Sequence, residues 1–293
     1  MHLARKPARL PQPYSTLNTR RGTLRFYLGD CLDVLRSLTP GSISVIVTSP
    51  PYNLGVRYRS YEDRLPRDRY LAWTGDWIGA AARALAPAGS LFLNVGAKPT
   101  DPWTPFDVAQ AARPHLRLQN TIHWIKSIAI DRGAAGAGAA LTRDLNIGHY
   151  KPINSDRFVN DCHEFIFHLT PDGRTPLDRL AIGVPYQDAS NVARWRGASG
   201  NVRCRGNTWF IPYETIQSRD KDRPHPATFP PRIPEYCARL HGISRAGVLM
   251  DPFLGLGSSA IAAAQLGVDF VGVELDRHYL DEAIARVKAS LPR

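Results

Sequence analysis

The sequence predicts an α/β fold, in which a mostly parallel, twisted sheet is covered by helices on both faces. Strand-like and helix-like segments alternate along most of the chain, which is typical of parallel sheets. The strand candidates, such as Ile43–Val47, are short, nearly all apolar and rich in β-branched residues, as strands buried on both faces are. The length of 293 residues favours one large domain with an inserted region over two full domains.

The first part of the chain alternates strands with helices. Asp68–Leu85 predicts a helix because its apolar residues keep helical spacing, and Pro87 and Gly89 end it. Pro40-Gly41 ends the shorter helix before it in the same way. We expect strands over Leu24–Leu28, Ile43–Val47, Ser90–Val95, Asn120–Lys126 and Glu164–Leu169, the last near the sheet edge, and helices over Cys31–Leu38, Asp68–Leu85 and Phe106–Ala112.

The alternation returns near the carboxyl end. There we expect helices over Ile233–Leu240, Ser258–Leu266 and Arg277–Leu291 and strands over Val248–Met250 and Phe270–Val273. The run of glycine and alanine within Ile128–Ser155 predicts a mobile loop, and residues 170–223 lose periodicity while Arg, Gly and Trp accumulate. We therefore divide the chain into a flexible basic arm (1–20), a catalytic part (21–169), an insertion (170–223) and a cofactor-binding part (224–293).

The composition favours a polyanionic partner. The formal net charge is +11 and the isoelectric point is near 9.8, and basic residues gather in the amino-terminal arm and at Arg194, Arg196, Arg203 and Arg205. A solvated basic surface without a ligand is the alternative interpretation. The four cysteines lack metal-ligand spacing, so we assign no metal and no disulfide. With no secretory signal or membrane-spanning run apparent, we expect a cytoplasmic protein.

The segment Asp251–Ser259 predicts a ligand-binding turn between a strand and a helix. Gly255 and Gly257 allow a tight turn and a close approach to a ligand. Glu274 ends the following strand, 19 residues after Gly255, where a carboxylate accepts hydrogen bonds from ribose in nucleotide-binding α/β folds. A tight turn with no ligand is the alternative interpretation. The segment contains Asp251, Pro252, Phe253, Gly255, Gly257, Ser258 and Ser259.

The same segment argues against a dinucleotide. Ala260 takes the place of the third glycine of the dinucleotide fingerprint, although alanine is sometimes allowed there. Asp251 puts a carboxylate at the strand end, where it would repel a pyrophosphate and attract a cationic sulfonium or ammonium group. The cofactor that fits best is a nucleoside carrying positive charge, a description that S-adenosylmethionine meets.

The segment Thr48–Tyr52 predicts a polar site at the end of a buried strand. The Ser49 hydroxyl can accept one hydrogen bond from an amino group, and the Pro50 carbonyl a second, because Pro51 holds Pro50 extended. Tyr52 offers a flat face for a base to stack on. Two acceptors would favour a tetrahedral nitrogen, with attack before proton loss because serine is a weak base. A Pro-Pro turn closed by an ordinary tyrosine is the alternative.

Three segments together resemble the motifs of the DNA amino-methyltransferases, namely Thr48–Tyr52, Asp251–Ser259 and Val271–Asp276. Looser matches are Leu28–Asp33, His225–Pro230 and Asn160–Ile166. The resemblance implies a Rossmann-like, S-adenosylmethionine-dependent methyltransferase fold. It implies catalysis by Ser49, Pro50, Pro51 and Tyr52, and a cofactor site formed by Asp30, Cys31, Thr48, His225, Phe229, Asp251, Pro252, Phe253, Gly255, Gly257, Ser258, Ser259, Glu274 and Leu275.

The order of these motifs is similar to the β arrangement of that family, in which the segment between them reads the DNA sequence. This implies target recognition by residues 170–223, contacts to double-stranded DNA from Arg194, Arg196, Arg203 and Arg205, and rotation of the target nucleotide out of the duplex.

Serine in the first motif position is associated within the family with cytosine N4; adenine N6 and an RNA substrate stay open as alternatives. The resemblance also implies a prokaryotic, nucleoid-associated protein, acting in a restriction-modification system or alone. It leaves open a homodimer and a cognate restriction endonuclease.

Overall fold

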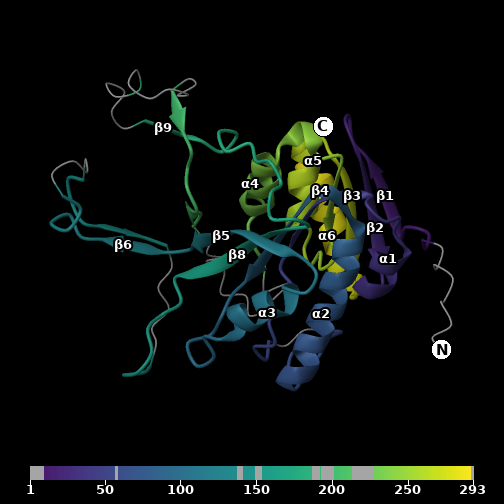
Figure 1. Cartoon of the computed structure of the whole chain (residues 1–293), viewed down its shortest axis with the longest axis horizontal. Helices are drawn as coiled ribbons and strands as arrows, with labels where there is room; N and C mark the ends of the chain where they lie inside the picture. Colours follow the sequence, from purple (N-terminus) through teal and green to yellow (C-terminus); the bar gives the residue numbers. More distant parts are fainter. Residues whose placement is uncertain are drawn as a thin grey trace.

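A nine-stranded sheet forms the centre of the molecule in the computed structural model, which describes residues 10–56, 59–136, 141–148, 154–186, 192, 201–212 and 228–291 (Figure 1). The strands are β1 (Ser15–Asn18), β2 (Thr23–Leu28), β3 (Ile43–Thr48), β4 (Leu85–Val95), β5 (Arg117–Ile125), β6 (Ile128–Ile130), β7 (Leu145–Ile147), β8 (His163–Thr170), β9 (Val184–Pro185), β10 (Val202–Arg203), β11 (Thr208–Phe210), β12 (Val248–Asp251) and β13 (Asp269–Glu274). The helices are α1 (Cys31–Ser37), α2 (Arg67–Ala84), α3 (Thr104–Ala112), α4 (Arg232–His241), α5 (Ser258–Leu266) and α6 (Arg277–Ser290), with a short 3-10 turn η2 (Ile243–Arg245).

The strand order across the sheet is β1-β2-β13-β12-β3-β4-β8-β5-β11. The five strands from β2 to β4 run parallel to one another, as do β5 and β11. β8 runs antiparallel to both of its neighbours, and β1 antiparallel to β2. These pairings confirm the predicted mostly parallel sheet.

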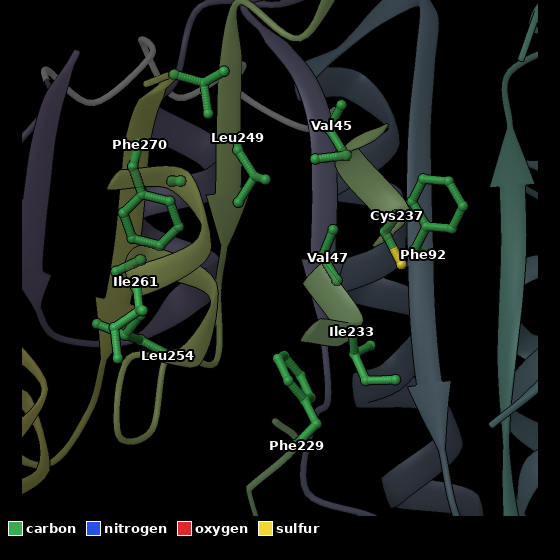
Figure 2. Packing of buried hydrophobic residues seen from close by; sticks show 14 of the residues in the cluster. Val45, Val47, Phe92, Phe229, Ile233, Cys237, Leu249, Leu254, Ile261 and Phe270 are labelled. Carbon is green, nitrogen blue, oxygen red and sulfur yellow. The ribbon is translucent and has the colours of Figure 1, made fainter. Parts of the chain in front are cut away.

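Helices cover both faces of the sheet because its central strands are apolar on both sides. In β3, Val45 and Val47 face the cluster that contains residues of α4, α5 and α6, whereas Ile43 and Ile46 face α1, α2 and α3. Figure 2 shows the first of these clusters, with Val47 next to Ile233 of α4 and Val45 further along β3, towards Cys237 of the same helix. Burial on both faces explains why β3 has no polar residue except Ser44 before its end.

The prediction of a flexible arm over residues 1–20 is wrong for its second half. Ser15–Asn18 forms the edge strand β1, which pairs with Thr23–Leu28. Leu17 packs against the hydrophobic core, and the Tyr14 hydroxyl donates a hydrogen bond of 2.8 Å to Asp281. A four-residue strand behind two prolines is too short for a clear alternation pattern, which hid it in the sequence. Residues 1–9 lie outside the described residues.

Two further expectations need correction. The predicted mobile loop Ile128–Ser155 contains a β-ribbon, because β6 and β7 pair antiparallel. Glu164–Leu169, expected near the sheet edge, forms most of β8 in the interior of the sheet, since β5 and β11 extend the sheet beyond it. Figure 1 shows the β6–β7 ribbon and β9 projecting outward from the body of the sheet.

Part of the predicted insertion 170–223 belongs to the central domain. β11 extends the sheet parallel to β5, and Trp209 on β11 is fully buried. The Trp124 indole N–H donates a hydrogen bond of 2.8 Å to the Ile211 carbonyl across this pair of strands. No helix within the described ranges is long and apolar enough to cross a membrane.

Candidate functional site

The predicted polar site Thr48–Tyr52, called the hook from here on, and the predicted glycine turn Asp251–Ser259 meet at one end of the sheet. β3 and β12 are parallel neighbours, with Val45 opposite Leu249, so their carboxyl ends lie side by side. A pocket opens there, where ligands bind in open α/β sheets. Its lining contains Gly29, Asp30, Cys31, Ser49, Pro50, Pro51, Tyr52, Ser60, Tyr61, Trp73, Thr228, Phe229, Asp251, Pro252, Phe253, Leu254, Gly255, Leu256, Ser258, Val273, Glu274, Leu275, Asp276 and Tyr279.

The charge of this lining suits a cationic nucleoside. Asp30, Asp251, Glu274 and Asp276 contribute carboxylates, and among the described residues that line the pocket there is no Lys, Arg or His. Such a surface repels pyrophosphate and attracts a sulfonium or ammonium group. Phe253 and Trp73 add an apolar wall, in which the two rings pack edge to face with their centroids 5.6 Å apart. The residues present therefore fit S-adenosylmethionine.

The glycine turn is fixed by the carboxylate of Glu274. Gly255 has φ 53° and Gly257 has φ 81°, both in the left-handed region that favours glycine. The Gly255 N–H donates a hydrogen bond of 2.8 Å to Glu274 Oε2, and the Asp276 N–H donates one of 2.9 Å to Oε1. Burial raises the pKa of Glu274, and these backbone donors act in the opposite direction. Glu274 thus holds the turn while its carboxylate lines the pocket.

Asp251, at the end of β12, is hydrogen-bonded to the end of β3 and to the start of α5. The Thr48 hydroxyl donates a hydrogen bond of 2.7 Å to Asp251 Oδ1, and the Ser259 hydroxyl donates to Oδ2. The Phe253 N–H adds a third donor at 3.0 Å. Burial is the largest influence and raises the pKa of Asp251 to about 6, against the lowering effect of these donors.

We expect the affinity for S-adenosylmethionine to fall as the pH is lowered from 7 to 5. Protonation of Asp251, whose pKa is about 6, removes a negative charge from the pocket that favours the sulfonium. One such proton weakens binding by at most about tenfold per pH unit below this pKa. Titration calorimetry at several pH values measures the change.

Two controls separate this effect from acid denaturation of the protein. S-adenosylhomocysteine lacks the sulfonium charge and should show a weaker pH dependence. Asp251→Asn should bind the cofactor more weakly at pH 7 with a flatter profile. If the cofactor affinity of Asp251→Asn fell with pH as steeply as that of wild type, the assignment to Asp251 would be contradicted.

The hook is part of a polar network that the sequence did not reveal. Ser49 Oγ lies 2.5 Å from the Tyr52 hydroxyl, which donates a hydrogen bond of 3.1 Å to Glu164 Oε2. The Asn94 amide donates to Tyr52 Oη at 2.7 Å and to Glu164 Oε2 at 2.6 Å. The Tyr70 hydroxyl donates a hydrogen bond of 3.0 Å to the Pro51 carbonyl. The backbone and the side chains of the hook are therefore both held in place.

The loop after the hook is organised by Asp63, which is 2% exposed. Its carboxylate accepts hydrogen bonds from the backbone N–H groups of Asn53, Leu54 and Val56 at 2.8 to 3.1 Å. Burial raises the pKa of Asp63, and the same donors act against it. Further along, the Ser60 hydroxyl donates a hydrogen bond of 2.5 Å to Asp276, which fixes the loop against the cofactor end of the pocket.

Most predicted site residues reach the pocket. All four catalytic candidates line it, and so do most of the cofactor candidates. Thr48, Gly257 and Ser259 lie behind the lining, where Thr48 and Ser259 hydrogen-bond to Asp251. His225 lies outside the described residues. Six further lining residues lie in the matched segments but were not named singly, namely Gly29, Thr228, Leu254, Leu256, Val273 and Asp276. The lining residues outside those segments, which sequence reasoning missed, are Ser60, Tyr61, Trp73 and Tyr279.

Two of the four arginines predicted to bind DNA, Arg203 and Arg205, lie in the described part of the chain. Arg194 and Arg196 lie outside the described residues. Arg203 lies on β10 and is exposed. Arg205 packs on the protein itself: its guanidinium donates to the Ile182 carbonyl at 2.9 Å and lies 5.0 Å from the centre of the Tyr236 ring. The described residues contain no cluster of His, Cys, Asp and Glu that could hold a metal ion.

Comparisons with known proteins agree with this geometry. A family model described as DNA methylase, for the N6 and N4 methyltransferases, matches residues 43–285. The type II methyltransferase M.ScaI of Streptomyces caespitosus is 28% identical over 267 residues, which cover 90% of this chain and 81% of that protein. M.BglII of Bacillus subtilis is 25% identical over 273 residues, covering 88% and 67%.

Solved structures share the fold. The cytosine-N4-specific PvuII DNA methyltransferase superposes with a TM-score of 0.62 at 16% identity, covering 95% of this chain and 93% of that one. A protein of Thermus thermophilus assigned as a DNA modification methylase, solved with S-adenosyl-L-methionine, has a TM-score of 0.57 at 24% identity, covering 92% and 94%. The predicted methyltransferase fold is thereby confirmed.

Proposed function

The chain belongs to the DNA methylase family of N6 and N4 methyltransferases, and from this we propose that it methylates the exocyclic N4 of cytosine in duplex DNA. Its cofactor is S-adenosyl-L-methionine. The observation that carries the proposal is one pocket in which Ser49 and Tyr52 lie beside four carboxylates and the glycine turn. The pocket thus offers acceptors for an amino group next to a surface suited to a sulfonium.

The residues of the hook orient the target nitrogen. The lone pair of an exocyclic amino group is delocalised into the ring, which makes the nitrogen a poor nucleophile. The Ser49 hydroxyl and the Pro50 carbonyl accept hydrogen bonds from its two N–H groups and favour a tetrahedral nitrogen whose lone pair is free to react. When bound, S-adenosylmethionine supplies an electrophilic methyl group. Tyr52 provides the face on which the base stacks.

The rest of the chain brings DNA to this pocket. A target base inside a duplex is out of reach, so its nucleotide rotates out at a cost of a few kcal/mol. The net charge of +11 favours phosphate contacts that help offset this cost. Arg203 on β10 is the predicted contact that remains exposed among the described residues. Because similar proteins include type II methyltransferases, we place the enzyme in a restriction-modification system.

Adenine N6 is the second candidate for the target. Both bases present an amino donor beside a ring-nitrogen acceptor, so the same hook can hold either one. Serine rather than aspartate at the first motif position favours cytosine.

The test is to identify the methylated nucleoside. Duplex plasmid and tRNA are incubated separately with the enzyme and S-adenosylmethionine, digested to nucleosides and analysed by mass spectrometry. We expect N4-methylcytosine in DNA and none in tRNA. N6-methyladenine would replace the proposed target but keep the mechanism. Methylation confined to tRNA, or no methylation, would refute the proposal.

A further inference from the structure

A partly buried chain of polar side chains leads from the hook to a charged pair beyond the pocket. It contains Ser49, Tyr52, Asn94, Glu164 and Lys126, of which only Ser49 and Tyr52 line the pocket. Ser49 follows β3, Asn94 belongs to β4, Glu164 to β8 and Lys126 follows β5. β8 runs antiparallel to its neighbours, so its first residues lie beside the carboxyl ends of β4 and β5.

The distances make this a continuous chain of hydrogen bonds. Ser49 Oγ is 2.5 Å from Tyr52 Oη, and Tyr52 Oη is 3.1 Å from Glu164 Oε2. The Lys126 ammonium is 3.1 Å from the other oxygen, Glu164 Oε1. Asn94, which is 1% exposed, donates to both Tyr52 Oη and Glu164 Oε2 and so keeps them together.

Close packing at Gly96 supports this arrangement. A Cβ atom there would lie 3.1 Å from Tyr52 Cε2 and 3.1 Å from Glu164 Cδ. These distances are tighter than ordinary contacts between carbon atoms. The absence of a side chain at Gly96 therefore lets Tyr52 and Glu164 approach each other.

We propose, on the basis of the function proposed above, that Glu164 is a positioning residue for Ser49 and the final acceptor of the proton that the methylated amino group loses. A carboxylate accepts and an ammonium only donates, so Glu164 accepts from Tyr52. Tyr52 Oη in turn accepts a hydrogen bond from the Ser49 hydroxyl. With its own proton directed to Tyr52, Ser49 presents lone pairs to the pocket and can accept from the amino group.

The same chain carries the proton away after transfer. Once the C–N bond has formed, the nitrogen is positively charged and gives one proton to Ser49 Oγ. The Ser49 proton passes to Tyr52 Oη, and the Tyr52 proton to Glu164 Oε2. Each hydroxyl gains and loses one proton, the product amine is neutral and the carboxyl is protonated. The Glu164 side chain is 16% exposed, so water can take up that proton.

Glu164→Gln tests the inference, with single-turnover methylation of duplex DNA as the measurement. We expect the methyl-transfer rate to fall by up to about 10²- to 10³-fold, the effect of losing one preorganised hydrogen-bonding partner, because Ser49 is no longer held with its lone pairs towards the amino group. The affinity for S-adenosylmethionine should stay within about twofold of wild type, since Glu164 does not line the pocket. The acid side of the wild-type pH–rate profile should flatten in the variant.

Tyr52→Phe removes the middle hydroxyl and keeps the ring that stacks on the base. We expect a loss similar to that of Glu164→Gln, and no further loss in the double variant, because both interrupt one chain. Glu235→Gln, the same change in a partly buried, ion-paired carboxylate of α4, serves as the matched control. If Glu164→Gln fails to fold, Tyr52→Phe and its pH profile decide the question.

The outcomes separate this inference from the proposed function. A wild-type enzyme that forms no methylated base would refute the function itself. If wild type methylates DNA while Glu164→Gln keeps the wild-type rate or pH profile, only the proton chain is refuted. Losses that multiply in the double variant would also refute it, because they would show two independent roles.

Discussion

Ser49→Ala is expected to lower the single-turnover rate of DNA methylation by about 10²- to 10³-fold, the effect of removing one preorganised hydrogen-bonding partner from a transition state. Ser49 lines the pocket at the end of β3, 2.5 Å from the Tyr52 hydroxyl. Alanine removes the acceptor for the target amino group and leaves the strand intact. Quenched-flow mixing with radiolabelled cofactor measures the rate without product release.

Cofactor binding provides the internal control for Ser49→Ala. The variant should bind S-adenosylmethionine with wild-type affinity, because the carboxylates and the glycine turn are unchanged. Ser37→Ala on α1, where the hydroxyl donates a hydrogen bond to the Val34 carbonyl of its own helix, should leave both quantities unchanged. A wild-type transfer rate in Ser49→Ala would refute the role of the hook.

The strands and helices near the cofactor were predictable because local sequence determines them. The predicted helix Ser258–Leu266 is observed with those bounds, since Gly257 precedes and Gly267 follows a segment whose central residues, Ala260–Ala264, are all apolar. β3 and β12 were recognisable as buried strands for a similar reason. Their meeting at one pocket followed from the rule that parallel strands place their carboxyl ends at the same edge.

Features that depend on distant pairings were not predictable. Glu164 is 112 residues from Tyr52 in sequence, and only the antiparallel register of β8 brings the two together. Trp73 keeps helical spacing with other apolar residues of α2, so its sequence pattern could not distinguish a core residue from one that lines the pocket. β11 is short and lies among arginines and glycines, which concealed its place in the sheet.

Gly255→Val is expected to abolish measurable binding of S-adenosylmethionine, with a loss of at least about 100-fold, and with it all methylation. Gly255 has φ 53°, a conformation that costs a β-branched residue roughly 1–2 kcal/mol or more. Gly255 also lines the pocket, and its N–H donates a hydrogen bond of 2.8 Å to the Glu274 carboxylate, so a shift of the backbone there disturbs the cofactor site. Titration calorimetry and thermal shift with added cofactor measure the loss.

The matched control for Gly255→Val is Gly41→Val, which separates backbone strain from loss of the site. Gly41 has φ 72° and nothing lies within 4 Å of a Cβ atom placed there, so this variant carries the strain without a clash. Both variants should melt a few degrees lower than wild type. Saturating cofactor stabilises a protein that binds it by about 2.7 kcal/mol at 100 times the Kd. That stabilisation should persist in Gly41→Val and vanish in Gly255→Val; its survival in Gly255→Val would place the cofactor elsewhere.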